Sequence, residues 1–85
     1  MMQGDRGIVI TGRDLKVVSA NARAEALSPR GRIARQDDLL EHFPQLSGKV
    51  SAGDVQEGTF TGISLDGILA DVFVMSAGDL VSFVF

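Results

Sequence analysis

The chain has 85 residues and no cysteine, which excludes disulfides and thiolate zinc sites. Its net charge of −3 argues against direct binding to nucleic acid. No apolar run approaches the ~20 residues that a membrane span needs, and the opening MMQGDRG lacks the apolar stretch of a secretory signal. We therefore expect a soluble, cytoplasmic protein that contacts neither nucleic acid nor membrane.

The beginning of the chain predicts two neighbouring strands. Residues 1–6 form a predicted disordered lead, and residues 7–85 a single domain. Residues 7–11 and 15–20 are rich in β-branched side chains, which favour strands. Gly12 predicts a tight turn between them, because glycine adopts positive φ without a steric penalty.

A short helix is expected directly after the second strand. Asn21 is a predicted N-cap, whose side-chain oxygen accepts from an amide of the first turn. Strong helix formers occupy residues 22–27. Pro29 disfavours helical geometry at Ser28, so this helix should end there.

A second short helix is predicted over residues 39–43. Asp38 fits its N-cap and Glu41 completes a capping box, while Pro44 ends the helix. Leu46 and Val50, four residues apart, predict a further short helix that is interrupted by glycine.

The last third of the chain predicts an antiparallel meander of three strands. These are residues 58–63, 68–75 and 80–85. The Asp-Gly pair at 66–67 is a strong hairpin signal, and residues 76–79 supply the second turn.

Large apolar side chains occupy both faces of this meander. An antiparallel sheet with one solvated face would alternate cleanly between apolar and polar residues. We therefore expect the outer face to meet a second copy of the chain, although a tolerated apolar surface is the alternative. The predicted dimer face comprises Leu69, Phe73, Met75, Val81, Phe83 and Phe85. Asp71 either pairs with a basic group across this interface or is exposed near the sheet edge.

This order of elements resembles that of a PAS domain. The segment with Ala20, Asn21, Ala24, Glu25 and Leu27 is similar to the A-N-x-A-A-E-x-L helix start that is frequent in that family. The resemblance implies an α+β fold with a five-stranded antiparallel sheet in the order 2-1-5-4-3. It also implies that the short helices between strands 2 and 3 pack on one face.

The resemblance further implies a sensory and dimerisation module of a signal-transduction or transcription-regulatory protein. Such a module acts by binding a small ligand or a partner, and it controls an output domain elsewhere in the parent chain. The segment over residues 21–55 is shorter than in cofactor-binding members, so we expect no haem or flavin. The alternative is a structural protein–protein interaction domain whose pocket is filled by side chains.

A ligand pocket would be lined by apolar residues from the strands and the helical segment, which equally suit a plain core. The candidates are Ile8, Ile10, Leu39, Phe43, Leu46, Phe60, Val72 and Val84.

Catalytic and metal-binding residues are not expected. His42 is the only histidine, and no serine lies in a recognisable nucleophile turn, so we interpret His42 as a surface or helix-end residue. Asp37, Asp38 and Glu41 are better explained by helix capping than by a metal site. We therefore predict neither an enzyme nor a metal or cofactor site.

Overall fold

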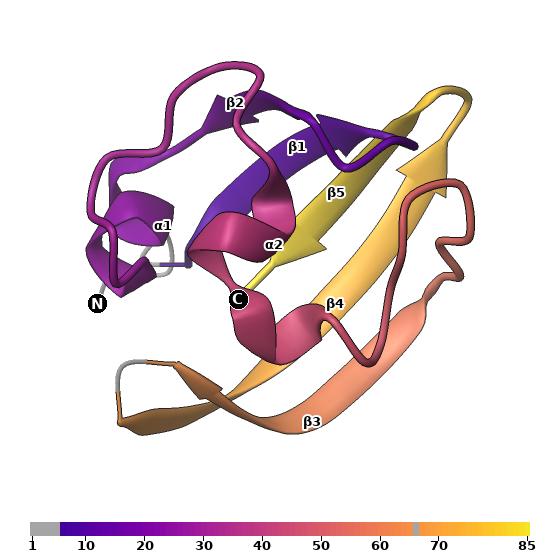
Figure 1. Cartoon of the computed structure of the whole chain (residues 1–85). Helices are drawn as coiled ribbons and strands as arrows, with labels where there is room; N and C mark the ends of the chain where they lie inside the picture. Colours follow the sequence, from indigo (N-terminus) through magenta and orange to yellow (C-terminus); the bar gives the residue numbers. More distant parts are fainter. Residues whose placement is uncertain (1–5, 66) are drawn as a thin grey trace.

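The computed structural model describes residues 6–65 and 67–85, so the predicted lead lies outside the described residues except for Arg6. Five antiparallel strands form one sheet in the order β2-β1-β5-β4-β3 (Figure 1). The strands are β1 (Ile8–Gly12), β2 (Val17–Ala20), β3 (Gly58–Leu65), β4 (Ile68–Ala77) and β5 (Leu80–Val84). The predicted α+β class and the strand order are confirmed.

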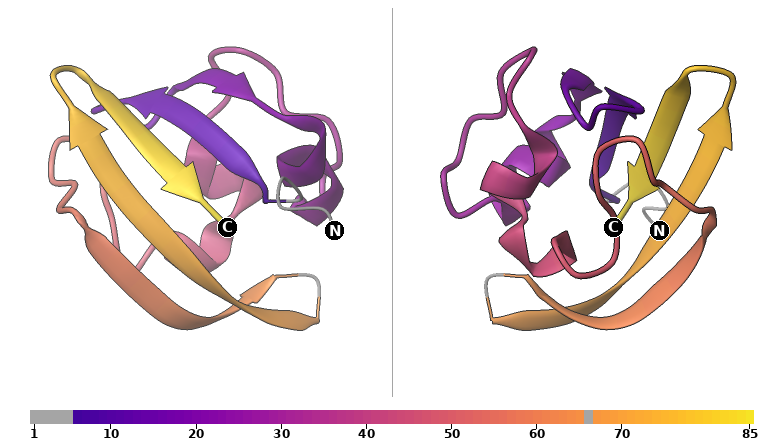
Figure 2. Two further views of the ribbon diagram at one scale, coloured as in Figure 1. Left: turned by 180° about the vertical axis from the view of Figure 1, so that it is seen from behind. Right: turned by 45° about the vertical axis from the view of Figure 1, so that its right-hand side comes forward.

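The helical elements gather on one face of this sheet. They are α1 (Ala22–Leu27), α2 (Leu39–His42) and the 3-10 helix η1 (Pro44–Leu46). Seen from behind, the strands lie in front of α2 and η1 (Figure 2, left), so none of the described helices covers the opposite face. None of the described helices is long and apolar enough to cross a membrane.

The hydrophobic core lies between the helices and the inner face of the sheet. Thr11 is the one polar side chain that β1 contributes to it, and its hydroxyl donates to the carbonyl of Gly12 over 2.7 Å. The largest fully buried apolar side chains are Phe43, Phe83, Leu15, Leu39, Leu46, Leu65, Val9, Val17, Val72, Val74 and Val81.

Asn21 caps α1 as predicted, and it also joins this helix to β1. Its Oδ1 accepts from the amide of Ala24 over 2.9 Å and from the amide of Ile8 over 3.0 Å. Its Nδ2 donates to the carbonyl of Arg6 over 2.8 Å. At the other end, the amide of Ser28 donates back into the last turn of the helix, which ends α1 before the proline. One asparagine therefore fixes the start of both elements.

The turn between β1 and β2 differs from the prediction. Leu15, not Gly12, adopts the left-handed conformation, with φ of 65°. The amide of Leu15 donates to the carbonyl of Gly12 over 3.0 Å, and the carboxylate of Asp14 accepts from the amide of Lys16 over 3.0 Å. Since the Leu15 side chain is buried in the core, its packing offsets a backbone penalty of about 1–2 kcal/mol.

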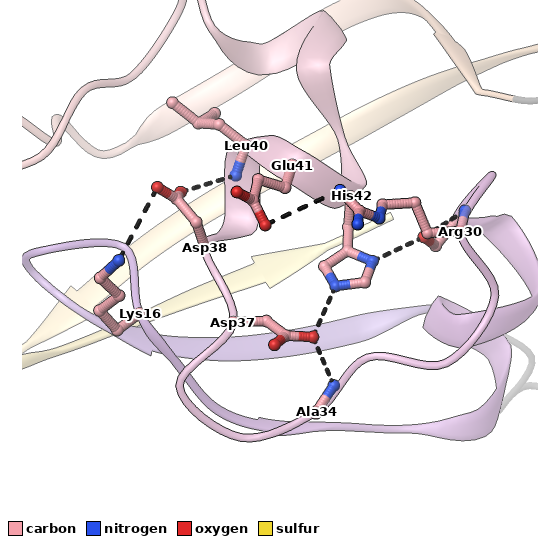
Figure 3. Close-up of polar contacts among 9 residues, drawn as sticks. Lys16, Arg30, Ala34, Asp37, Asp38, Leu40, Glu41 and His42 are labelled. Carbon is pink, nitrogen blue, oxygen red and sulfur yellow. Dashed lines mark hydrogen bonds and ion pairs between the residues drawn. The ribbon is translucent and has the colours of Figure 1, made fainter.

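The predicted capping box at α2 is only half formed. Asp38 accepts from the amide of Leu40 over 3.1 Å, as an N-cap should. Glu41 instead directs its carboxylate toward Arg30, at 3.8 Å, because the connecting segment brings this cation alongside α2 (Figure 3). The predicted helix through Leu46 and Val50 shortens to η1 followed by one hydrogen-bonded turn.

Candidate functional site

The face of the sheet that carries no helix exposes several large apolar side chains. Leu69 is 74% exposed, Met75 54% and Leu80 46%. Ile8, which is 39% exposed, lies on the same face, in a cross-strand row with the half-buried Val84 and Phe73. We refer to this surface as the outer face. It is built mainly by β1, β5 and β4.

Three residues of the predicted dimer face lie on the other side of the sheet. Val81, Phe83 and Phe85 are buried in the core, which corrects their assignment to the outer face. Strand register explains the correction, because Phe83 lies opposite Val74, an inner residue of β4. Leu69, Phe73 and Met75 do lie on the outer face.

The residues predicted to line a pocket divide between the two faces. Leu39, Phe43, Leu46 and Val72 are fully buried in one cluster, with Phe60 packed against it. Ile8, Ile10 and Val84 belong instead to the outer face, since Ile8 lies opposite Val84 and Ile10 opposite Ser82 on β5. The structure therefore does not bring these candidates together around one cavity.

A groove of about 430 Å³ runs over the outer face, and it includes one carboxylate. The Glu57 carboxylate accepts from the amide of Ser76 over 2.8 Å. This bond lies just before the first β3–β4 pair, Gly58 with Val74. Arg6 lies farther along the same face, with its guanidinium carbon 5.6 Å from the centre of the Phe73 ring. The groove is lined by Ile10, Glu57, Met75, Ser76, Ala77, Leu80 and Ser82.

A second candidate site is the row of hydrogen bonds that joins Ser28, His42 and Asp37. Its Nδ1 lies 2.8 Å from the hydroxyl of Ser28, and its Nε2 lies 2.9 Å from the carboxylate of Asp37 (Figure 3). Because the ionised carboxylate can only accept, Nε2 carries the proton, and Nδ1 of the neutral ring accepts from Ser28. The Ser28 hydroxyl in turn accepts from the amide of Arg30 over 3.2 Å.

This row of hydrogen bonds joins the end of α1, the connecting segment and α2. His42 is 3% exposed and Ser28 is 7% exposed, so the expected surface histidine is in fact buried. The hydrogen bond from His42 is the main cause that lowers the pKa of Asp37 below its ordinary value, and the amide of Ala34 adds to the effect. Spacing offered one signal, because His42 and the buried Leu39 lie three residues apart on the same face of α2.

The order serine, histidine, aspartate is that of a nucleophilic triad, but the surroundings do not suit nucleophilic catalysis. Ser28 is buried at the C-terminal end of α1, where the partial negative charge of the helix would oppose an oxyanion. Its amide already donates to the carbonyls of Ala24 and Glu25, both at 3.2 Å. The geometry therefore suits a structural clamp better than a reaction centre.

The acidic residues beside this row of hydrogen bonds do not converge on a common point. Asp37 faces His42, Asp38 caps α2 and lies 4.0 Å from Lys16, and Glu41 faces Arg30. Within residues 6–65 and 67–85, no group of three or more histidine, aspartate or glutamate side chains is placed to hold a metal ion.

Comparisons with known proteins assign neither a family nor a function to this chain. No family model matches the chain, and neither a curated protein nor a solved structure matches it.

Proposed function

We propose that this chain is a PAS-like regulatory module that self-associates through the outer face of its sheet. In this role it is a cytoplasmic signalling or transcription-regulatory domain, and its assembly state controls an output domain elsewhere in the parent chain. The observation that carries the proposal is the exposure of Leu69, Met75 and Leu80 on a face that no helix within residues 6–65 and 67–85 covers.

The outer face has an area of the same order as the interface of a specific dimer. Five strands about 4.8 Å apart give a width of roughly 24 Å, and strands of four to ten residues run for roughly 13–34 Å. A stable interface covers about 800 Å² on each partner, roughly a sixth of the 5026 Å² of surface accessible on this chain. The flat area of the outer face, roughly 300–800 Å² by these dimensions, reaches that value at its upper end.

The filled interior favours assembly over an internal ligand as the basis of regulation. Leu39, Phe43 and Leu46 pack directly against the sheet and are fully buried. This supports the alternative that the domain is a structural interaction module with no ligand. A second candidate, small-ligand sensing, is supported by the outer groove, whose size lies within the range of about 300–1,000 Å³ for ligand pockets.

Catalysis is not part of the proposal. The one Ser-His-Asp chain among the described residues is buried at the wrong end of a helix for nucleophilic chemistry, as set out above. We accordingly propose a binding module that needs neither a metal nor a cofactor.

The test is the replacement of one outer-face residue by a carboxylate. Met75→Glu would place a charge in the interface, and we expect at least about a tenfold weaker dimer, because burying an unpaired charge costs more than about 1.4 kcal/mol. Ile68→Glu is the matched control: Ile68 is 56% exposed, but it lies at the end of the β3–β4 hairpin opposite the inner residue Leu65. Sedimentation velocity over a wide concentration range measures both. Equal dimerisation of the two variants would overturn the proposed interface.

A further inference from the structure

The two edge strands of the sheet, β2 and β3, differ in whether another segment pairs with their outer side. At β2 the edge is closed, because the amide of Val17 donates to the carbonyl of Asp37 over 2.9 Å and the amide of Gln36 donates to the carbonyl of Val17 over 2.8 Å. An isolated bridge between Lys16 and Asp38 continues this pairing. The connecting segment thus acts as a cover for one edge.

The edge at β3 has no corresponding cover among the described residues. The backbone hydrogen bonds of β3 run to β4, and none joins it to another described segment. Figure 1 shows β3 as the outermost strand on that side. An open edge is a template for an additional strand, because its outward amides and carbonyls are ready to pair.

The sequence of β3 carries few of the features that block such pairing. Its eight residues, GTFTGISL, include no proline and no charged side chain. The residues at its surface are small or carry hydroxyls: Gly58, Thr59, Thr61, Gly62 and Ser64 are exposed. A bulge lies between Phe60 and Ile63, and it divides the edge into short stretches. The edge therefore suits a short segment better than long sheet-to-sheet association.

The charged residues in the part of the sequence that contains β3 and β4 all have one sign. Residues 50–85 contain Asp54, Glu57, Asp66, Asp71 and Asp79 but no lysine or arginine, so all eight basic residues lie in the first 49. Glu57 immediately precedes β3, and Asp71 lies on β4 opposite the bulge, between the pairs Phe60–Val72 and Ile63–Ala70. Both acidic residues are exposed, and β3 and β4 carry no cation of their own. Arg6 lies over the ring of Phe73 on the same face, so it is the cation that a basic partner would meet there.

We propose that the edge of β3 docks an extended basic segment of a partner protein by strand addition. Side chains on one side of the added strand would lie beside Thr59 and Ser64, on the same side of the sheet as Glu57 and Asp71, and these positions favour lysine or arginine. Alternate side chains would lie beside Phe60 and Ile63, and these positions favour apolar residues. A second copy of the chain fits this edge less well, because its own β3 is flanked by the same acidic groups.

The probe is a seven-residue peptide of alternating lysine and valine with blocked ends. Its binding is followed by chemical-shift changes and amide hydrogen exchange of the intact chain. We expect changes concentrated at β3 and slower exchange of its outward amides. A peptide with glutamate in place of lysine should bind at least about threefold more weakly, and higher salt should weaken the lysine peptide. Methylating alternate peptide nitrogens on the edge-facing side should abolish binding, since it removes the backbone donors.

Paired variants test the contribution of charge. The double change Glu57→Gln and Asp71→Asn should weaken the lysine peptide at least about threefold. Asp79→Asn, which removes one negative charge at the β4–β5 turn, should change affinity less than about twofold. No binding, equal binding of both peptides, or changes centred on β2 would overturn the proposal. If the outward amides of β3 gain protection with concentration in the absence of peptide, and still do so in Met75→Glu, a second copy occupies the edge and the proposal is overturned. Since the outer-face dimer is tested at Met75, either proposal can fail alone.

Discussion

The hydrogen bonds of His42 with Ser28 and Asp37 give the sharpest prediction about stability. His42→Ala removes a ring that is 3% exposed and leaves the Ser28 hydroxyl without its acceptor. An unsatisfied buried hydroxyl costs about 1–3 kcal/mol, and the lost packing of the ring adds to this, so we expect about 2–4 kcal/mol in total. The whole domain should have only about 4–13 kcal/mol of unfolding free energy, by the usual value per residue. The loss is therefore a large fraction of the total.

Urea denaturation followed by circular dichroism measures this loss, with an expected slope of about 1 kcal/mol per molar urea for so small a chain. The double-mutant cycle of Ser28→Ala with His42→Ala should show a coupling of about 0.5–1.5 kcal/mol, because each change removes the same hydrogen bond. If His42→Ala costs less than about 0.5 kcal/mol, the clamp contributes nothing and our reasoning is wrong. Ester hydrolysis that disappears in Ser28→Ala would instead show that Ser28, His42 and Asp37 are catalytic.

Three further changes probe the fold. Gly7→Ala should destabilise by about 1 kcal/mol, because an added Cβ would lie 3.1 Å from the Cα of Ala24; thermal unfolding measures the loss, and an unchanged midpoint would contradict the close approach. Gln36→Gly should stabilise by about 0.5–1 kcal/mol, since Gln36 is exposed with φ of 74°; Gln36→Ala should give no gain in the same assay, and equal effects would exclude strain as the cause. Stability should fall on acidification below pH 3.8, the ordinary pKa of Asp37. In the folded state the hydrogen bond from His42 lowers this pKa, so the ionised carboxylate stabilises the fold, and this stabilisation is lost as the carboxylate is protonated. Asp37→Asn should make acid unfolding shallower, whereas an identical pH profile would show that this carboxylate contributes nothing.

The sequence of strands and helices along the chain could be predicted from local signals, whereas the order of the strands within the sheet was implied by the resemblance to PAS domains. Gly67, which follows β3 closely, adopts φ of 80°, and Gly78 adopts φ of 61° in the next turn, while Asp66 of the predicted Asp-Gly turn lies outside the described residues. Asn21 capped α1 as expected, since capping depends only on neighbours in sequence.

The division between inner and outer faces could not be read from alternation alone. A period of two separates Val81 and Phe83 from Leu80 and Ser82, but it does not show which set faces the helices. Because all these strands carry apolar residues on both sides, only the register with β4 decides, and it places Phe83 beside Val74. The hydrogen bonds of His42 with Ser28 and Asp37 could not be predicted from the sequence either, because they depend on how three segments pack together.

The most direct test of self-association is a native mass spectrum of the freshly purified chain, repeated over a wide range of concentrations. The proposed function predicts a dimer of bare chains whose fraction rises with concentration and falls sharply in Met75→Glu. Extra mass retained by that dimer would identify a ligand class and favour the outer groove as the sensing site. A monomer at every concentration would contradict the central proposal that the outer face assembles two copies.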